Sequence, residues 1–197
     1  LIRDGGIHGV VVRLGKGFNC IEVHDDRILA YGGALDVSVA AVARDASLGG
    51  LEFLSGIPGT IGGALRMNSG AYGCEMKDVV LYASVVDSDG KQRHIRADEM
   101  SFAYRYTDIP EDWIIVGVVM RGIPDDRISI IKRMERIRTQ REISQPLRMK
   151  TGGSTFRNPD LEDSHGLKAW QLIDKVGQVV YTSPGFAANT RIQTFDV

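Results

Sequence analysis

The chain has 197 residues, of which 43% are hydrophobic and 25% charged, which is ordinary for a soluble globular protein and too apolar for a disordered one. Its 24 Lys and Arg are matched by 25 Asp and Glu, so it has no excess of positive charge for binding nucleic acid or an anionic membrane. Cys20 and Cys74 lack the CxxC spacing of a zinc or redox site, the histidines form no spaced metal motif, and no apolar run approaches the ~18 residues that cross a bilayer. These features predict a cytoplasmic protein with free thiols and no metal.

The first part of the chain alternates short apolar runs with turns. Runs rich in β-branched and aromatic residues predict strands over Val10–Leu14, Phe18–Val23 and Ile28–Tyr31. From Leu35 to Leu48 the apolar residues recur at intervals of three and four, which favours a helix, and Gly49-Gly50 supply its end. A glycine-rich loop is expected to follow at once.

Two further strand patterns follow that loop. Val79–Asp87 and Lys91–Ile95 flank a Ser-Asp-Gly turn and predict a hairpin, and Trp113–Met120 predicts a strongly apolar strand. Helical and strand patterns are mixed without regular βαβ repetition. The sequence therefore predicts the α+β class.

The pattern changes after Gly122-Ile123-Pro124. Apolar residues at 130, 131, 134 and 137 then line one face of a highly charged helix. The change predicts a domain boundary, with a first domain at residues 1–124 and a second at residues 125–197.

Residues 49–73 read GGLEFLSGIPGTIGGALRMNSGAYG and contain eight glycines. Glycine lets successive amide groups converge on one anion, so this segment could cradle the pyrophosphate of a dinucleotide. It is neither the Rossmann GxGxxG pattern nor a P-loop, because GIPGTIGG is not followed by Lys-Ser or Lys-Thr. The alternative is that the glycines only serve tight turns, which their density disfavours.

Within this segment, Gly50–Gly73 resembles the flavin-binding signature of the UDP-N-acetylenolpyruvoylglucosamine reductase family. Three further segments agree with the family in the expected order: FAYR at Phe102–Arg105, GGSTFRNP at Gly152–Pro159 and AWQLIDKVG, a helix, at Ala169–Gly177. The resemblance covers Leu1–Gly177.

The resemblance implies a FAD-binding fold of the vanillyl-alcohol-oxidase type, followed by a C-terminal α+β domain for the UDP-sugar. The family's first FAD loop would lie just upstream of Leu1, so we expect the FAD-binding domain to lack its N-terminal part. Residues 178–197 do not continue the family pattern, and a shifted reading frame is one explanation, which sequencing of the encoding DNA would test. The substrate domain is then expected to be incomplete.

The implied function is NADPH-dependent, FAD-mediated reduction of UDP-N-acetylglucosamine enolpyruvate to UDP-N-acetylmuramate, a step of peptidoglycan precursor and cell-wall synthesis. FAD and NADPH are the implied cofactors, and a monomer is expected. The cofactor-binding residues that the resemblance implies are Gly56, Ile57, Pro58, Gly59, Thr60, Gly62, Gly63, Asn68, Gly70 and Ala71.

The resemblance also assigns catalytic roles. Ser154 matches the family's serine acid, which protonates the α carbon, and Arg105 matches the arginine that stabilises the enolate through a guanidinium fork. Tyr104, Arg157 and Asn158 are the implied substrate-binding residues. Without the motifs, a serine beside two glycines is usually a turn residue and a strand arginine is usually a surface group.

Other functions stay open at this level. A different FAD oxidoreductase acting on an alcohol or hydroxy acid would share the flavin loop, although GGSTFRNP disfavours it. The family's last catalytic residue, a glutamate, has no counterpart after residue 177. The chain could therefore also be an inactive fragment, or a noncatalytic module that binds flavin or a nucleotide sugar.

Overall fold

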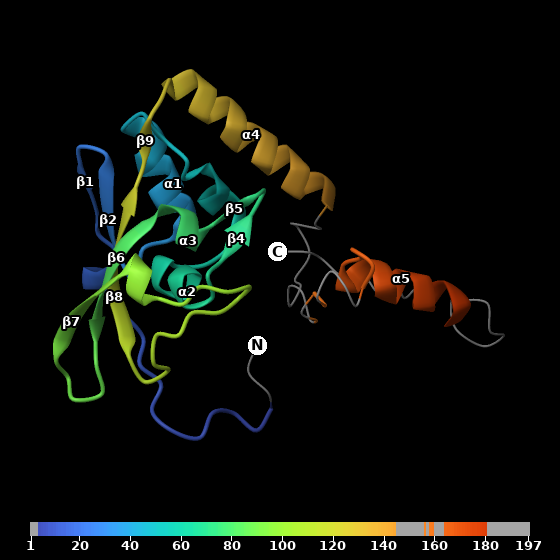
Figure 1. Cartoon of the computed structure of the whole chain (residues 1–197), viewed down its shortest axis with the longest axis horizontal. Helices are drawn as coiled ribbons and strands as arrows, with labels where there is room; N and C mark the ends of the chain where they lie inside the picture. The colour runs from blue at the N-terminus through green and yellow to red at the C-terminus, as the bar shows by residue number, and fades with distance from the viewer. Residues whose placement is uncertain (1–3, 145–155, 157, 160–163, 181–197) are drawn as a thin grey trace. The chain divides into compact units, whose positions relative to one another are not determined.

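The computed structural model describes residues 4–144, 156, 158–159 and 164–180. The chain divides by its internal contacts into two compact units, Ile2–Arg141 and Glu142–Val197. Each is described by itself below. The larger unit contains the main sheet and most of the helices (Figure 1).

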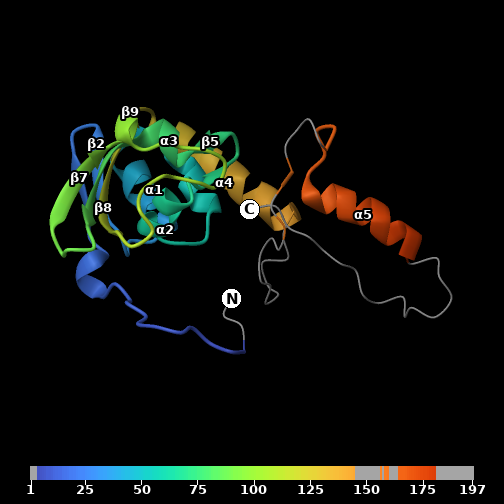
Figure 2. The ribbon, with the colours of Figure 1, turned by 60° about the horizontal axis from the view of Figure 1, so that its bottom comes forward.

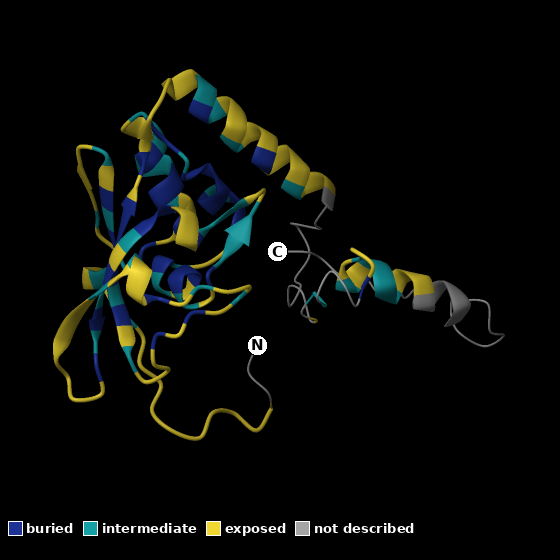
Figure 3. Cartoon of the chain, in the orientation of Figure 1, coloured by how far each residue is buried: buried dark blue, intermediate teal, exposed yellow. Residues whose placement is uncertain are grey.

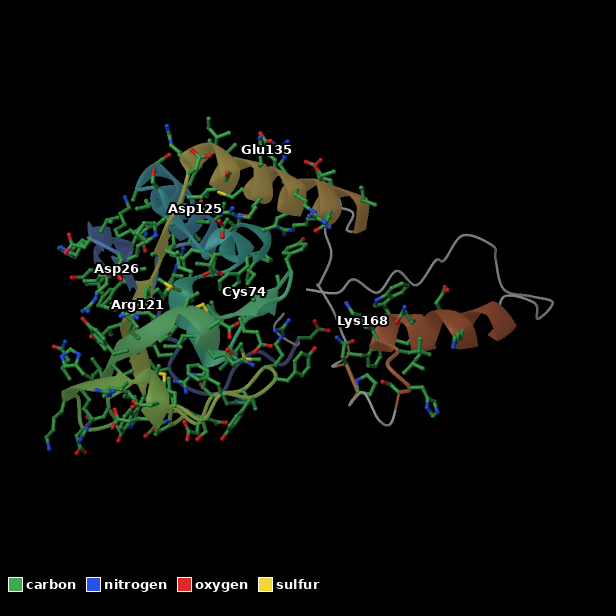
Figure 4. All side chains as sticks on the ribbon, turned by 45° about the horizontal axis from the view of Figure 1, so that its top comes forward. Asp26, Cys74, Arg121, Asp125, Glu135 and Lys168 are labelled. Carbon is green, nitrogen blue, oxygen red and sulfur yellow. The ribbon has the colours of Figure 1, made fainter. Side chains whose placement is uncertain are left out.

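The larger unit is built on a five-stranded, fully antiparallel sheet. In spatial order its strands are β1 (Ile21–His24), β2 (Arg27–Tyr31), β8 (Ile114–Arg121), β6 (Val80–Val86) and β7 (Gln92–Arg96). The central strand β8 pairs with β2 on one side and β6 on the other, so that Val118 lies opposite both Ala30 and Ala83. Beside β2, Asp26 and Arg121 form an ion pair of 3.5 Å (Figure 4).

One face of this sheet forms the core. Side chains alternate between the two faces of a strand, and those on the inner face are wholly buried (Figure 3): Ile28, Ala30, Ala83, Val85, Val118 and Met120. Helices α1 (Asp36–Asp45) and α2 (Ile61–Arg66) lie on this side of the sheet (Figure 2). In α1 the buried residues Val39, Ala40 and Ala43 recur at helical spacing and provide its apolar face.

The sequence predictions for β2, β6, β7, β8 and α1 are confirmed to within a few residues. The predicted strand at Val10–Leu14 is wrong. That segment has no regular structure and Val10 is 91% exposed, because β-branched residues favour extended backbone but a strand also needs a partner, and no described residue pairs with this one. Lys16–Phe18 form a single 3₁₀ turn, so the predicted strand at Phe18–Val23 starts only at Ile21.

The glycine-rich segment, predicted as a loop, is more ordered than expected. It contains a 3₁₀ helix, η2 (Glu52–Gly56), followed by α2, and then the short hairpin of β4 (Gly70–Ala71) and β5 (Cys74–Glu75), which leads into α3 (Met76–Val79). Before it, β3 (Leu48–Gly49) pairs with β9 (Ile123–Pro124), and η3 (Ala97–Glu99) follows β7. Two glycines inside α2 disguise this helix in the sequence, because glycine is a poor helix former.

Helix α4 (Arg127–Ser144) packs on the larger unit. Ile130 and Ile137 are buried, and the Arg133 guanidinium donates to the Glu52 carboxylate at 2.7 and 2.9 Å. The division between the two units falls in the last turn of α4, between Arg141 and Glu142. The domain boundary that the sequence analysis placed at residue 124 stays a prediction. The ion pair and the buried isoleucines fix the helix to the unit before it.

The second unit contains α5 (Ala169–Val180), which confirms the predicted helix at Ala169–Gly177. The Asn158 side-chain oxygen accepts a hydrogen bond of 3.0 Å from the Ala169 amide, so Asn158 satisfies one of the unpaired donors at the start of this helix. Among the described residues, no helix is long and apolar enough to cross a bilayer.

Candidate functional site

The turn between η2 and α2 presents backbone to solvent. Ile57 is buried and its amide donates to Leu54, which anchors the start of the turn, whereas Pro58 and Gly59 are exposed. The turn is fixed from the other side by an isolated bridge between Leu35 and Thr60. The chain therefore holds a short exposed loop between two fixed points.

Some backbone amides around this turn already donate a hydrogen bond and others do not. The first two amides of α2 do: Ile61 donates to the Ala34 carbonyl at 2.9 Å and Gly62 to the Gly32 carbonyl at 3.0 Å. In the part of the chain that the structure describes, the amides of Gly59 and Thr60 donate to no other residue. Unpaired backbone amides of this kind suit an anion such as a phosphate.

Gly62 has a packing role. A Cβ there would lie 2.9 Å from the Gly32 carbonyl oxygen, which is closer than real Cβ contacts come. A larger side chain would separate α2 from the Gly32-Gly33 segment. Gly62 therefore allows the start of α2, and the turn before it, to lie close to the Gly32 backbone.

Asn68 connects the glycine-rich segment to its surroundings. Its side chain is wholly buried, and its amide group donates to Glu75 Oε2 and to the Ala103 carbonyl, both at 3.0 Å, while its oxygen accepts from the Lys77 amide at 3.0 Å. Its φ of 39° lies in the left-handed region, which Asn tolerates better than most residues. Asn68 therefore fixes the position of the segment that contains Arg105.

Arg105 lies against the glycine-rich segment. It belongs to a tight hairpin closed by mutual backbone hydrogen bonds between Ala103 and Tyr106, and its φ is 54°. The guanidinium lies 5.1 Å from the centre of the Tyr104 ring, and Nη2 donates to the Gly70 carbonyl at 3.3 Å. The structure thus brings the predicted Tyr104 and Arg105 next to Gly70, one of the predicted cofactor residues.

A second arginine, Arg66, supports the same region, and the sequence did not single it out. It donates from the end of α2 to the carbonyls of Pro110 at 3.0 Å and Trp113 at 2.6 Å. The Thr107 hydroxyl donates to the Arg66 carbonyl at 3.1 Å. Burial lowers the pKa of Arg66, but an arginine keeps its charge. Arg66 thereby holds the chain that follows the Arg105 hairpin.

The predicted cofactor residues differ in exposure. Pro58, Gly59 and Gly63 are exposed; Thr60, Gly62, Gly70 and Ala71 are half-buried; Gly56, Ile57 and Asn68 are buried. Gly56 leaves room for the Tyr72 ring, which a Cβ at residue 56 would overlap. The exposed and half-buried residues can face a ligand, whereas the three buried ones act within the chain.

Asp36 is a residue that the sequence analysis missed. It is only 1% exposed, and neither of its carboxylate oxygens has a hydrogen-bond partner among the described residues. Burial raises its pKa from 3.8 to about 7. In the sequence it looks like an ordinary acidic residue in the first turn of a helix, and no pattern there reveals that the side chain is enclosed.

The remaining predicted site residues are placed as follows. Ser154 and Arg157 lie outside the described residues, and Asn158 lies in the second unit, where it caps α5. Within the described ranges, no three His, Cys, Asp or Glu side chains gather as a metal site would require.

The chain is similar in sequence to known flavin enzymes. A family model described as an FAD binding domain matches residues 1–96. UDP-N-acetylenolpyruvoylglucosamine reductases from Rhodospirillum rubrum and Azorhizobium caulinodans are 54% and 50% identical to the chain over 177 residues, which is 90% of this chain and 56% of each relative. The chain therefore spans about half the length of the curated relatives that it matches.

A solved structure agrees with these sequence matches. The chain superimposes on UDP-N-acetylenolpyruvylglucosamine reductase from Thermus caldophilus with a TM-score of 0.75 and 31% identity, over 87% of this chain and 60% of that one. The α+β, FAD-binding fold that the sequence predicted is thereby confirmed. The chain is thus similar, over nine-tenths of its length, to a part of the UDP-N-acetylenolpyruvoylglucosamine reductases.

Proposed function

We propose that the protein to which this chain belongs reduces UDP-N-acetylglucosamine enolpyruvate to UDP-N-acetylmuramate, with NADPH as the reductant, in the cytoplasm. The observation that carries the proposal is the 54% identity to a reductase of that name, together with the position of Arg105 beside Gly70. Bound FAD would supply the transfer of hydride from NADPH to the enolpyruvyl group.

The residues of the chain suit a flavin dinucleotide. The free amides of Gly59 and Thr60 would hold part of its pyrophosphate, and the neighbouring half-buried positions at Gly70 and Ala71 would line its site. The chain has no surplus of positive charge, so anion binding must come from such local donors.

Arg105 would act on the substrate. Addition of hydride to the β carbon leaves negative charge between the α carbon and the carboxylate, and a guanidinium fork can hold both carboxylate oxygens without losing its charge. The Tyr104 ring and the Gly70 carbonyl already orient the Arg105 guanidinium. Ser154 would then donate a proton to the α carbon, and Tyr104, Arg157 and Asn158 would bind the substrate.

Absorbance spectroscopy tests the proposal. The purified chain is incubated with FAD, desalted, and mixed anaerobically with NADPH and then with the enolpyruvyl substrate. Retained yellow flavin that NADPH bleaches and substrate reoxidises supports the reductase function. Arg105→Ala should retain and bleach the flavin but reoxidise at least about a hundredfold more slowly, because one donor to the developing charge is lost.

A noncatalytic binding module is the second candidate, because the unpaired amides of Gly59 and Thr60 would hold a phosphate whether or not a substrate reacts. In that case flavin would be retained, but substrate would not reoxidise it. A protein that stays colourless after desalting contradicts both candidates for the chain as it stands.

A further inference from the structure

The carboxyl group of Asp36 lies next to Gly59, in the Pro58–Thr60 turn. A Cβ on Gly59 would lie 3.1 Å from Asp36 Oδ2, and the Asp36 amide donates to the Gly59 carbonyl at 3.2 Å. Both carboxylate oxygens are buried and lack a hydrogen-bond partner among the described residues. An ionised carboxylate is costly in such a position.

Among the described residues, no charged group is recorded that offsets this cost, since Arg44 and Asp45 at the other end of α1 pair with each other. Residues 32–35, 37–39 and 57–63, which surround Asp36 in the chain and in the turn, include no ionisable side chain. Of the other elements that pack on α1, η2 carries Glu52, which pairs with Arg133, and β1 carries Glu22 and His24, which lie 3.4 Å apart. Burial is the only cause that raises the pKa of Asp36, while the start of α1 favours the ionised form more weakly.

The turn beside Asp36 is the place where we expect the pyrophosphate to bind, through the Gly59 and Thr60 amides. A carboxylate on buried Asp36 and a phosphate on the Gly59 and Thr60 amides would place like charges on either side of residue 59 or close beside it, in a setting that screens them less than water does. The negative charge of the phosphate would therefore repel that of the Asp36 carboxylate, and protonation of Asp36 would remove this repulsion.

We propose that Asp36 binds a proton when a dinucleotide pyrophosphate occupies the Pro58–Thr60 turn, so that the affinity for FAD depends on pH through this one buried side chain. The inference rests on the proposed function, because FAD supplies the pyrophosphate. The proton comes from solvent and binds to a carboxylate oxygen of Asp36. Asp36 is thus a positioning residue, which acts through the turn.

Proton binding by Asp36 makes the dissociation constant for FAD depend on pH in a defined way. Above the pKa of free Asp36, each complex that forms takes up one proton, and the dissociation constant for FAD rises by up to about tenfold per pH unit. Below that pKa the side chain is already neutral, and the dissociation constant is flat. The pyrophosphate of FAD does not itself titrate in this range.

The experiment measures FAD binding to the full chain by calorimetry between about pH 6 and about pH 9, in buffers of different ionisation enthalpy, which reports proton uptake directly. Asp36→Asn keeps the shape of the side chain but cannot ionise, and Asp89→Asn makes the same change on the exposed turn between β6 and β7. We expect proton uptake and pH-dependent binding in the unchanged chain and in Asp89→Asn, and neither in Asp36→Asn.

The same pH dependence in Asp36→Asn, or binding without proton uptake above neutral pH, would overturn the proposal. Failure of all three proteins to bind FAD would instead contradict the proposed function for this chain. Carbon NMR of the Asp36 carboxyl then decides, with ADP-ribose as the probe, because its pyrophosphate diester does not titrate in this range. A titration midpoint that the probe raises supports the proposal, and a midpoint that does not move overturns it.

Discussion

The side-chain amide of Asn68 donates a hydrogen bond of 3.0 Å to the carbonyl oxygen of Ala103, and this bond joins the glycine-rich segment to the hairpin that contains Arg105. The two segments lie 35 residues apart in the chain. Because the amide is wholly buried and fully bonded, its loss leaves several polar groups without partners. The position of Arg105 therefore depends on a residue that need not touch a ligand.

The variant Asn68→Gly separates the contribution of the Asn68 side chain to stability from that of its left-handed backbone conformation. Glycine accepts the φ of 39° but makes none of the three hydrogen bonds, so the free energy of unfolding should fall by about 2–4 kcal/mol in urea denaturation. Asn68→Ala should cost about 1 kcal/mol more, because alanine also resists the left-handed conformation. Two variants that both unfold within about 0.5 kcal/mol of the unchanged chain would show that these bonds do not stabilise the hairpin.

The attachment of α4 can be measured with a double-mutant cycle. Arg133→Met, Glu52→Gln and the double variant should give a coupling energy of about 1–3 kcal/mol, since the Glu52 carboxylate is nearly buried and accepts two bonds from the guanidinium. Each single variant should also speed amide hydrogen exchange in α4. A coupling near zero would mean that the Arg133–Glu52 pair does not hold the helix, and that contacts such as those of Ile130, Ile137 and Arg127 do.

Asp36 should also make stability depend on pH. Its pKa of about 7 in the folded chain lies above its ordinary value of 3.8, so its contribution to stability is complete below about pH 4 and is lost as the pH rises to about 7. At 1.36 kcal/mol per pKa unit the loss is about 4 kcal/mol at most.

Urea denaturation of Asp36→Asn and the unchanged chain, at about pH 4 and about pH 8, measures this loss. Asparagine cannot ionise, so the variant should gain stability relative to the unchanged chain as the pH rises. Any destabilisation that the amide itself causes is the same at both pH values and cancels in this comparison. A difference between the two proteins that is the same at both pH values would contradict a raised pKa.

The two cysteines should differ in reactivity. Cys20 is exposed, whereas Cys74 is half-buried. Burial first, and then the nearby Asp78, raises the pKa of the Cys74 thiol to about 11. Because the thiolate is the reactive form, the single-cysteine variant Cys20→Ser should react with an aromatic disulfide reagent at least about tenfold more slowly at pH 8 than Cys74→Ser. In denaturant both should react alike, and equal rates in the folded state would contradict the burial of Cys74.

The sequence predicts those elements whose pattern is local. The run Trp113–Met120 is almost continuously apolar and becomes β8, the buried centre of the sheet, and the spacing of apolar residues in α4 is helical from its first turn to Ile137. The run Val10–Leu14 has an equally good strand composition but no described partner, and strand pairing is a long-range property that composition does not contain.

The sequence predicts those site residues that lie in a recognisable motif. It does not reveal residues whose role depends on burial by distant parts of the chain. GIPGTIGG marks the turn and FAYR marks the Arg105 hairpin, and the hairpin contacts the glycine-rich segment at Asn68 and Gly70. Neither the Arg66 hydrogen bonds nor the enclosure of Asp36 follows from spacing, because both depend on backbone that arrives from elsewhere in the chain. The roles of Ser154 and Arg157 stay predictions.

The strand order has a consequence for how the chain folds as it is synthesised. Strand β8 is made after β1, β2, β6 and β7, yet it is the strand that joins the two hairpins, because β2 and β6 each pair with it and not with each other. Until Arg121 has left the ribosome, the nascent chain holds two separate hairpins whose apolar faces lack a common sheet. Completion of the sheet is thus a late, long-range event, and chaperones that shield apolar surface have their greatest effect just before it.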